Sequence, residues 1–424
     1  ITYEIRRVDQ DNSGRRGTAL FGFEEIATIL EQAADGSCQI AYEDLEFKSA
    51  KAATDWQEKY FRRKIEHVRT LYRRDNLEGL LPLGALEPLA LPGESYKRAF
   101  TPGLLNQVFQ RNDQPLLDDP VALLRGKAGD QGGYVDLDND HHWWIPAGRA
   151  YFHPDSVDAN SELAEARAHF FLPRRYVDPF GHSSRVDFDD YDLLMKETRD
   201  ALDNRVTVET NDYRVLQPQL VSDPNRNQTE VVFDALGSVV GTAVMGKDGE
   251  HLGDSLANFE ADLTDAGIVA HLDKPLDNPH SILGGATTRL VYDLFAYQRS
   301  KGQPEPQPAV VYTMVREMHE SDLETGQKSK IQHSFSYSDG FGREIQKKIQ
   351  AEPKPLDLND PNSPHVDPRW VGSGWTIFNN KGKPVRQYEP FFTKEHEFEF
   401  NPRIGVSPTL FYDPLERVVC TLHP

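Results

Sequence analysis

Cysteine is scarce in this chain, whose 424 residues include only two, Cys38 and Cys420. A disulfide framework needs several pairs of cysteines, and a Cys-x-x-Cys zinc site needs closely spaced thiols. Both are therefore excluded. We expect the two isolated thiols to be small residues of the core.

Long apolar runs and an excess of positive charge are also absent. No run approaches the roughly 18–20 apolar residues of a spanning helix, so we expect no membrane insertion by this segment. The 67 acidic and 47 basic residues give a net charge of −20, which argues against a nucleic-acid partner. The opening ITYEIRRVDQDN has no initiator Met and no leader pattern, so we interpret the chain as a piece of a longer protein.

The composition is that of a globular protein, with 27% charged and 38% hydrophobic residues. The length predicts two to three domains or one large repetitive architecture. The strongest helical pattern lies in 54–76, where Thr54 and Gln57 form a capping box and aromatic and aliphatic residues recur every three or four positions. We interpret the arginines of this segment, which include Arg62 and Arg69, as a solvated helix face; the alternative is an anionic partner.

From about residue 176 the pattern changes to short alternating stretches between turn residues. Residues 331–338 alternate apolar and polar side chains, which predicts a half-buried strand. The stretches VTVETNDYRVL, QTEVVFDALGSVVGTAV and EHEFEFNP indicate further strands. Between them, 246–308 contains apolar residues at helical spacing and is interpreted as a helical insertion, and a strand is expected to begin near Ala309.

A short Asp-centred phrase is the main repeated feature. Asp or Asn at the first turn position accepts backbone hydrogen bonds, Pro at the second presets φ, and Gly at the fourth accepts positive φ and closes the turn into a bulge. Steps of about 11 or 22 residues fit consecutive hairpins. The predicted structural turn residues are Asp178, Gly181, Asp200, Asp223, Asp234, Gly237, Asp339, Gly342, Gly382 and Asp413.

Three copies depart from the pattern at the fourth position, where Asp203, Arg226 and Glu416 stand in place of Gly. Non-glycine residues with positive φ are uncommon, so we expect these turns to be distorted or of another type. An ordinary all-β domain with well-formed turns is the alternative explanation of the phrase.

The phrases YSDGFGREIQKKIQAEP and FYDPLERVV resemble the RHS, or YD-repeat, family. Longer runs, such as RWVGSGWTIFNNKGKPVRQYEPFF, resemble the C-terminal half of the B component (SpvB/TcdB-like) of bacterial insecticidal Tc toxin complexes. This resemblance is strongest over residues 170–424. It implies a mainly β fold in which antiparallel YD-repeat hairpins form part of a large curved shell.

The resemblance also implies a function and a set of partners. In the family, the B component and part of the C component enclose a cytotoxic segment of the C component, and a propeller outside this segment docks on the A component. The chain is therefore expected to be a secreted structural segment, without catalytic residues, cofactor or metal. Its expected parts are a mixed segment (1–175), a YD-repeat region (176–245), the helical insertion (246–308) and a second YD-repeat region (309–424).

Two other functions are kept open. An extracellular YD-repeat adhesion or carbohydrate-binding module would use exposed aromatic residues such as Trp370 and Trp375. A SpvB-like ADP-ribosyltransferase would use a Glu-x-Glu pair, which Glu395, Glu397 and Glu399 offer. We interpret these glutamates as the polar face of a strand.

Two clusters have residue types that bind metal ions. The stretch DNDHHWWIP offers Asp138, Asp140, His141 and His142, and VDFDDYD (186–192) is rich in carboxylates. Adjacent histidines in a strand point to opposite faces, so we interpret the first as a packed loop or strand. The second lacks an EF-hand pattern and is interpreted as a solvated loop.

Overall fold

The structure is a computed structural model that describes residues 1–7, 24, 27, 39–45, 60–112, 114–117, 119–126, 132–357, 360 and 362–424. The chain divides into two units, Ile1–Arg205 and Val206–Pro424. It is mainly β with antiparallel sheets and few helices, as the sequence predicts; one described strand pair, β2 with β3, is parallel. No helix in the described ranges is long and apolar enough to cross a membrane.

The first unit is built from short sheets, with the strand orders β1-β3-β2, β4-β5-β8, β6-β7 and β9-β10-β11-β12. The helices α3, α4 and α5 of the described residues accompany them, and each begins at a side chain that accepts a backbone N–H, which satisfies a donor that the helix leaves unpaired. The elements are β1 (Thr2–Arg7), β2 (Gln39–Ile40), β3 (Tyr60–Glu66), β4 (Val68–Tyr72), β5 (Pro92–Phe100), α3 (Pro102–Val108), β6 (Gln110–Arg111), β7 (Gln114–Pro115), α4 (Pro120–Leu124), β8 (Trp143–Pro146), β9 (Arg149–Tyr151), α5 (Ala159–Ala168), β10 (Arg175–Val177), β11 (Ser183–Phe188) and β12 (Met195–Arg199).

The prediction of a helix over 54–76 is wrong for the part that the structure describes. Residues 60–66 and 68–72 form β3 and β4, which pair with β1 and β5. Aromatic and β-branched residues favour strands, and pairing with distant strands overrides the helical spacing. Thr54 and Gln57 lie outside the described residues.

The arginines of this segment are also not a solvated helix face. Arg73 is buried and makes a bidentate ion pair with the buried Glu162, at 2.8 and 2.7 Å. Arg69 lies over the ring of Trp144 and bonds Asp138. These guanidinium groups therefore hold the first unit together internally, because a buried charge must be paired.

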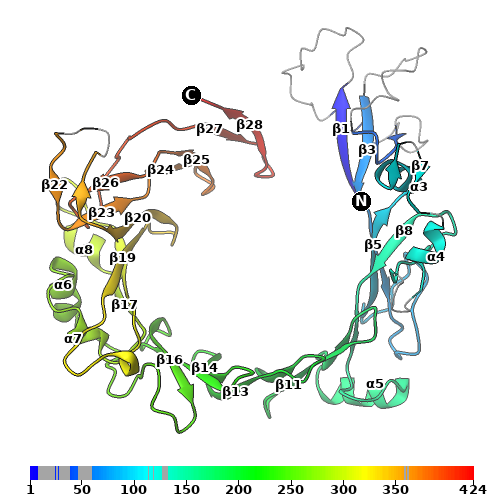
Figure 1. The fold of residues 1–424 in the computed structure, drawn as a ribbon, viewed down its shortest axis with the longest axis horizontal. Helices are drawn as coiled ribbons and strands as arrows, with labels where there is room; N and C mark the ends of the chain where they lie inside the picture. Colours follow the sequence, from blue (N-terminus) through cyan, green and yellow to red (C-terminus); the bar gives the residue numbers. More distant parts are fainter. Residues whose placement is uncertain are drawn as a thin grey trace. The chain divides into compact units, whose positions relative to one another are not determined.

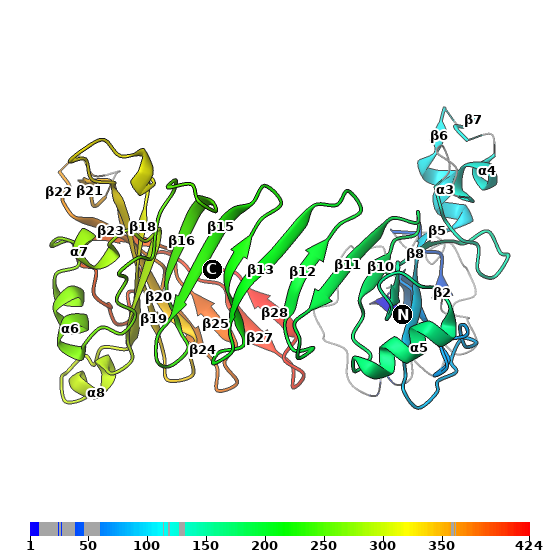
Figure 2. The same ribbon diagram turned by 90° about the horizontal axis from the view of Figure 1, so that it is seen from below.

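The second unit contains the order β13-β14-β15-β16-β17-β18-β19-β20-β23-β26, a second sheet in the order β24-β25-β27-β28, and the β21-β22 hairpin. In Figures 1 and 2, helices α6, α7 and α8 lie together beside β17–β19. The elements are β13 (Arg205–Asp212), β14 (Gln217–Ser222), β15 (Asn227–Phe233), β16 (Val239–Lys247), α6 (Asp265–Asp273), α7 (His280–Leu283), β17 (Thr288–Asp293), α8 (Ala296–Ser300), β18 (Ala309–Arg316), β19 (Ile331–Ser338), β20 (Glu344–Ala351), β21 (Lys354–Pro355), β22 (His365–Val366), β23 (Arg369–Gly372), β24 (Thr376–Phe378), β25 (Pro384–Gln387), β26 (Phe391–Thr393), β27 (Thr409–Tyr412) and β28 (Val418–Leu422).

One face of the second unit's main sheet forms its core. Alternate residues of β17, β18 and β19 are buried, as the period of two predicts for 331–338. Tyr312, Phe335 and Trp370 lie at the centre of this core, with Phe335 stacked on Tyr312 and edge-on to Trp370. The insertion covers part of this face, since Leu256, Leu283 and other apolar side chains between β16 and β17 belong to the same core.

Three expectations for this region are wrong. The segment 288–293 is the strand β17 and not a helix, because it pairs with β16 and β18. The stretch EHEFEFNP is an irregular loop and not a strand. Cys420 lies in β28 and is partly exposed, so it is not a core residue; Cys38 lies outside the described residues.

The loop 394–400 covers the rest of the core face through polar contacts. Gln346 and Glu399 exchange two hydrogen bonds, at 2.9 and 3.2 Å. The ammonium of Lys348, which is fully buried, donates to the Glu395 carbonyl at 3.0 Å and lies 3.4 Å from the Glu399 carboxylate. The imidazole Nε2 of His396 lies 2.9 Å from the Leu272 carbonyl of α6, so the loop also contacts the insertion.

The buried His333 predicts a pH dependence of stability. Burial, assisted by His280, lowers the pKa of His333 to about 4, against about 6.5 in the unfolded chain. Between these values the unfolded state binds a proton that the folded state does not. The free energy of unfolding of the second unit should therefore fall as the pH drops from about 6.5 to 4.

Urea unfolding across this pH range, followed by tryptophan fluorescence, measures the effect. His333→Gln should flatten the slope between pH 6.5 and 4, even if it lowers stability at pH 7. The same substitution at the exposed His365 is the matched control and should leave the slope as in the wild type. Equal slopes for His333→Gln and the wild type would contradict the prediction.

Candidate functional site: the aspartate turns

The turns at the predicted Asp residues share one hydrogen-bonding arrangement, which Asp339 illustrates. Its Oδ1 accepts from the backbone N–H groups of Phe341 and Arg343, at 2.9 and 3.1 Å. The N–H of Gly342 donates to the Asp339 carbonyl at 3.1 Å, and the N–H of Asp339 donates to the Arg343 carbonyl at 3.0 Å. One carboxylate therefore satisfies the two N–H groups that the turn would otherwise leave unpaired.

The same arrangement recurs along the chain. The structure places the first-position residue of each turn at the junction of two antiparallel strands, with both backbone hydrogen bonds present. Asn379, at the weakest sequence match, uses its side-chain oxygen in the same way, at 3.0 Å from the N–H groups of Lys381 and Lys383. The turns begin at Asp178, Asp200, Asp223, Asp234, Asp339, Asn379 and Asp413.

The fourth position of every one of these turns has positive φ. Gly181, Gly237, Gly342 and Gly382 have φ between 74° and 94°. This region is accessible to glycine at little steric cost. Beyond two of these turns the strand register shifts by one residue, at Val232/Phe233 in the pair β15–β16 and at Tyr337/Ser338 in the pair β19–β20, which marks a β-bulge next to the turn.

The expectation that three turns would be distorted is wrong. Asp203, Arg226 and Glu416 adopt φ of 65°, 69° and 65°, and their turns keep both backbone bonds. A left-handed non-glycine residue costs roughly 1–2 kcal/mol. Two backbone bonds and the Asp bonds, each worth about 0.5–1.5 kcal/mol, offset that cost. The first-position carboxylate therefore determines the turn, and the fourth residue adapts to it.

The fifth position is part of the motif and was missed in the sequence. Its side chain bonds the Asp Oδ2 in five turns, through a histidine, an asparagine or an arginine. The signal was present, because a side chain able to donate a hydrogen bond stands four residues after each of these aspartates. The five residues are His182, Asn204, Asn227, Arg343 and Arg417.

These contacts lower the carboxyl pKa values in several turns. For Asp200 the first cause is the Asn204 side chain, and for Asp413 it is the N–H of Arg417. For Asp339, partial burial acts in the opposite direction, and the bonds from Arg343 outweigh it. The ionised carboxylate is thus the form that the turns bind.

Two turns of related design were not predicted. Asp189 lies in the acidic stretch interpreted as a solvated loop, but it is buried and its Oδ1 accepts from the N–H groups of Tyr191 and Leu193. Asp192 closes this turn with φ of 54°. Asp212 accepts from the N–H of Arg214 at 2.9 Å in the turn between β13 and β14.

The other candidate residues are also used in local contacts. In the stretch 136–142, the Asp136 carboxylate accepts from the N–H groups of Asp140 and His141, and His142 Nδ1 lies 2.8 Å from Asp140. Among the described residues, no group of three or more His, Cys, Asp or Glu side chains is placed to hold a metal ion.

The residues of the two alternative functions lie in the core of the second unit and in the loop that covers it. Trp370 is fully buried in the core, and Trp375 is partly buried against Phe398 and Phe400, so Trp370 is not the exposed aromatic that was expected. Glu399 is bonded to Gln346, Thr393 and Lys348. The Glu-x-Glu residues therefore lie in the covering loop.

Comparison with known proteins identifies the fold. No family model matches the chain, and no curated protein sequence matches it. Among solved structures, TcdB2-TccC3 matches with a TM-score of 0.55 and 22% identity, over 90% of this chain and 17% of that chain. The same pair without its hypervariable C-terminal region matches at 0.54 and 20%, over 89% and 19%.

A Tc holotoxin pore of Photorhabdus luminescens also matches, with a TM-score of 0.54 and 20% identity, over 89% of this chain and 19% of that chain. The chain thus spans less than a fifth of the length of these structures. At this level of identity the likeness shows the fold of a Tc toxin component.

The turn geometry predicts opposite effects for substitutions at the fourth position. Gly342→Val should lower the free energy of unfolding by roughly 1–3 kcal/mol, because a β-branched residue is forced to a φ of 74°. No neighbouring atom lies within 4 Å of the position of a Cβ there, so backbone strain is the only direct cost. Urea denaturation measures the change, and unchanged stability would contradict the assigned turn.

Arg226→Gly should raise the free energy of unfolding by about 1 kcal/mol, because it removes the cost of positive φ at a residue whose φ is 69°. The gain is reduced by the larger entropy of glycine in the unfolded chain. Arg226→Ala serves as the matched control, since it shortens the side chain but keeps the Cβ. Equal free energies of unfolding for the Gly and Ala variants would contradict this prediction.

Proposed function

We propose that the chain is a wall segment of a toxin-enclosing shell in a Tc-type complex, and that its role is structural. The observation that carries the proposal is the repeated Asp turn within a fold that matches TcdB2-TccC3 over 90% of the chain. Each turn adds one antiparallel strand to the sheet. A ribbon extended one strand at a time is suited to enclosing a volume, because few strand edges remain open.

The two faces of the second unit's sheet support this role. One face is buried under the insertion and the loop 394–400. The opposite face of β18 and β19 has small and uncharged side chains, among them Thr313, Ser334 and Ser336. A wall needs one face stabilised by packing and another that can face an enclosed chain without binding it tightly.

A catalytic role has less support. The residues with the chemistry for it are used for other purposes: the Asp carboxylates hold turns, and Glu399 helps to bury Lys348. We therefore propose that the chain is not an enzyme. Its partners would be the C component, which supplies the rest of the shell and the cargo, and the A component through a propeller outside this segment, in an extracellular complex.

Electron microscopy of the full-length protein that contains these residues, mixed with its C component, tests the proposal. The expected result is a hollow particle whose wall accounts for both polypeptides. The toxic segment of the C component should also become resistant to added protease, because the wall excludes the protease.

The C component alone is the control, and its C-terminal segment should stay sensitive to the protease. A mixture that forms no hollow particle, or one in which the segment is digested as fast as in the control, would overturn the proposed function.

A further inference from the structure

The second unit has a row of turns along one edge. The Arg214 guanidinium donates to the Asp234 carbonyl, which joins the first two turns. Strand register brings Asp293 opposite Val310 and Ala309 opposite Ser338, next to the Asp339 turn. This edge, here called the turn rim, consists of residues 212–216, 234–237, 293–297, 339–342, 379–382 and 413–416.

The remaining turns of the rim also contact one another. Arg343 lies over the ring of Phe378, beside the turn 379–382. The Lys381 ammonium donates to the Pro414 carbonyl at 3.0 Å, which joins the last two turns. Figure 2 shows α8 and the tips of the β24–β25 and β27–β28 hairpins along the lower edge of this unit.

Large apolar side chains project from the turn rim. The third turn position holds Leu236, Phe341 and Leu415, which are 76%, 85% and 70% exposed. Turn residues are usually polar or small, so these three are not needed for the turn itself. A row of exposed apolar side chains marks an interaction surface. The rim also exposes Tyr213, Leu216, Leu294, Phe295 and Tyr297.

The charges of the turn rim are compensated locally, although the chain carries −20. Five of its carboxylates pair with an arginine or lysine on or next to the rim, and Asp234 accepts two backbone N–H groups, which weakens the field around the apolar tips. A partner with an acidic surface can therefore approach here more easily than elsewhere. The pairs are Asp212–Arg214, Asp293–Arg299, Asp339–Arg343, Lys383–Glu416 and Asp413–Arg417.

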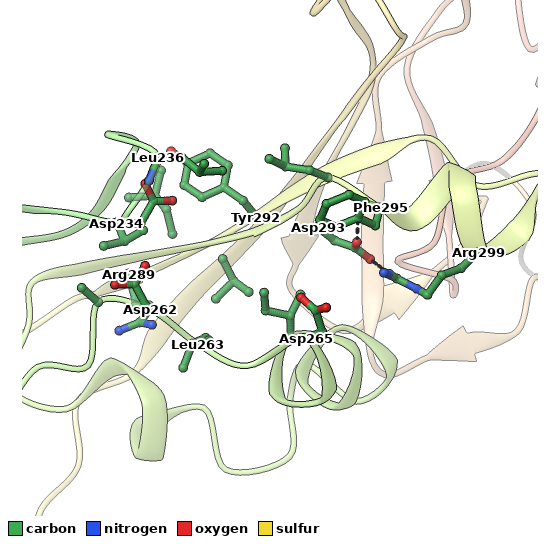
Figure 3. A pocket seen from close by; sticks show the side chains of 16 residues that line it. Asp234, Leu236, Asp262, Leu263, Asp265, Arg289, Tyr292, Asp293, Phe295 and Arg299 are labelled. Carbon is green, nitrogen blue, oxygen red and sulfur yellow. Dashed lines mark hydrogen bonds and ion pairs between the residues drawn. The ribbon is translucent and has the colours of Figure 1, made fainter. Parts of the chain in front are cut away.

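A pocket of about 160 Å³ opens on this rim between the Asp234 turn and the segment 293–297. Its apolar walls include Val240, Leu263 and Val291. Figure 3 shows Leu236 and Tyr292 on the side opposite Leu263 and Asp265, with Phe295 at one end.

Most polar groups around the pocket are engaged elsewhere, and Asp265 lies at the start of α6 on one side of it. Asp262 accepts from the N–H of Ala235, and Asp293 pairs with Arg299. The Arg289 guanidinium lies over the Phe259 ring and donates to the Glu260 carbonyl. The pocket is therefore suited to an apolar side chain and not to an ion.

We propose that the turn rim docks onto the turn edge of another Asp-turn β-ribbon, in a second polypeptide, and that the pocket takes an apolar side chain from the tip of such a turn. Three of the rim turns of this chain show which apolar side chain that edge presents: leucine or phenylalanine, 70% to 85% exposed at the third position, whereas Lys381 stands there in the turn 379–382. The partner edge consists of the same kind of turns. Its carboxylates are therefore paired within that edge, and its apolar tip side chains are exposed. The inference rests on the proposed function in that the second ribbon is the other part of the shell.

The test uses a head-to-tail cyclised peptide of residues 335–347, which presents Phe341 at its turn, as a model of the partner edge. Burial of one Phe side chain corresponds to millimolar or weaker binding, so the chain is titrated with millimolar peptide and observed by methyl NMR. Saturable shifts are expected at the Leu236, Leu263 and Ile268 methyls. The peptide with Phe341→Ser should bind at least about tenfold more weakly.

Matched variants of the chain test whether the peptide binds at the pocket or at any exposed leucine. Leu236→Ser with Phe295→Ser removes the two apolar lips and should abolish the shifts. Leu202→Ser changes an equally exposed tip, at 84% exposure, in the first unit and should leave them unchanged. Equal binding of both peptides, equal binding to the double variant, or no saturable shift at these methyls would overturn the proposal.

A second copy of the chain is the other candidate for binding at the rim. Sedimentation of the chain alone, over a range of concentrations, tests this self-association. A monomer is expected; a dimer that the double variant abolishes would assign the rim to self-association and overturn the proposed partner. The outcomes are independent of the shell experiment. Peptide binding without a hollow particle rejects the shell and keeps the docking pocket, whereas a hollow particle without peptide binding rejects the pocket alone.

Discussion

A carboxylate oxygen that accepts two backbone N–H groups is the interaction on which this fold depends. In four of the Asp turns it accepts from the N–H groups of residues three and five, and in the turns of Asp223 and Asp413 from that of residue five, so the chain can reverse direction within a few residues. Every following strand takes its register from that reversal. The sheet of the second unit follows the order of the sequence from β13 to β20 because each connection is either such a turn or a segment that returns to the adjacent strand.

The sheet of the second unit also depends on the segments that cover its core face. The core face of β17–β20 has buried polar residues, among them His333, Gln346 and Lys348, beside the aromatic centre. Leaving such groups unpaired would cost more than the apolar contacts around them provide. The loop 394–400 supplies partners for Gln346 and Lys348 through its backbone and Glu399, and its His396 contacts α6. His333 bonds the Tyr312 hydroxyl within the sheet. The loop and the insertion therefore form one cover.

The sequence predicted the features that depend on local chemistry. The Asp phrase and the alternation of Ile331, His333, Phe335 and Tyr337 are visible in single segments, and the strand after the proline-rich stretch begins at Ala309 as expected. The segments that failed depend on distant partners. Residues 60–72 have helical spacing but pair with β1 and β5. The loop 394–400 alternates like a strand, yet its backbone and the Glu399 carboxylate bond Lys348 and Gln346 of β20.

The turns held by Asp203, Arg226 and Glu416 have a consequence for how such a chain can change over time. Because the first-position carboxylate sets the backbone, the fourth position loses its strict demand for glycine and becomes free to vary. Glu416 shows one use of that freedom, since its carboxylate reaches Lys383 of the neighbouring turn at 2.9 Å. A ribbon that needs one carboxylate or amide oxygen per reversal leaves most other turn positions free to serve contacts between neighbouring turns, as Glu416 does.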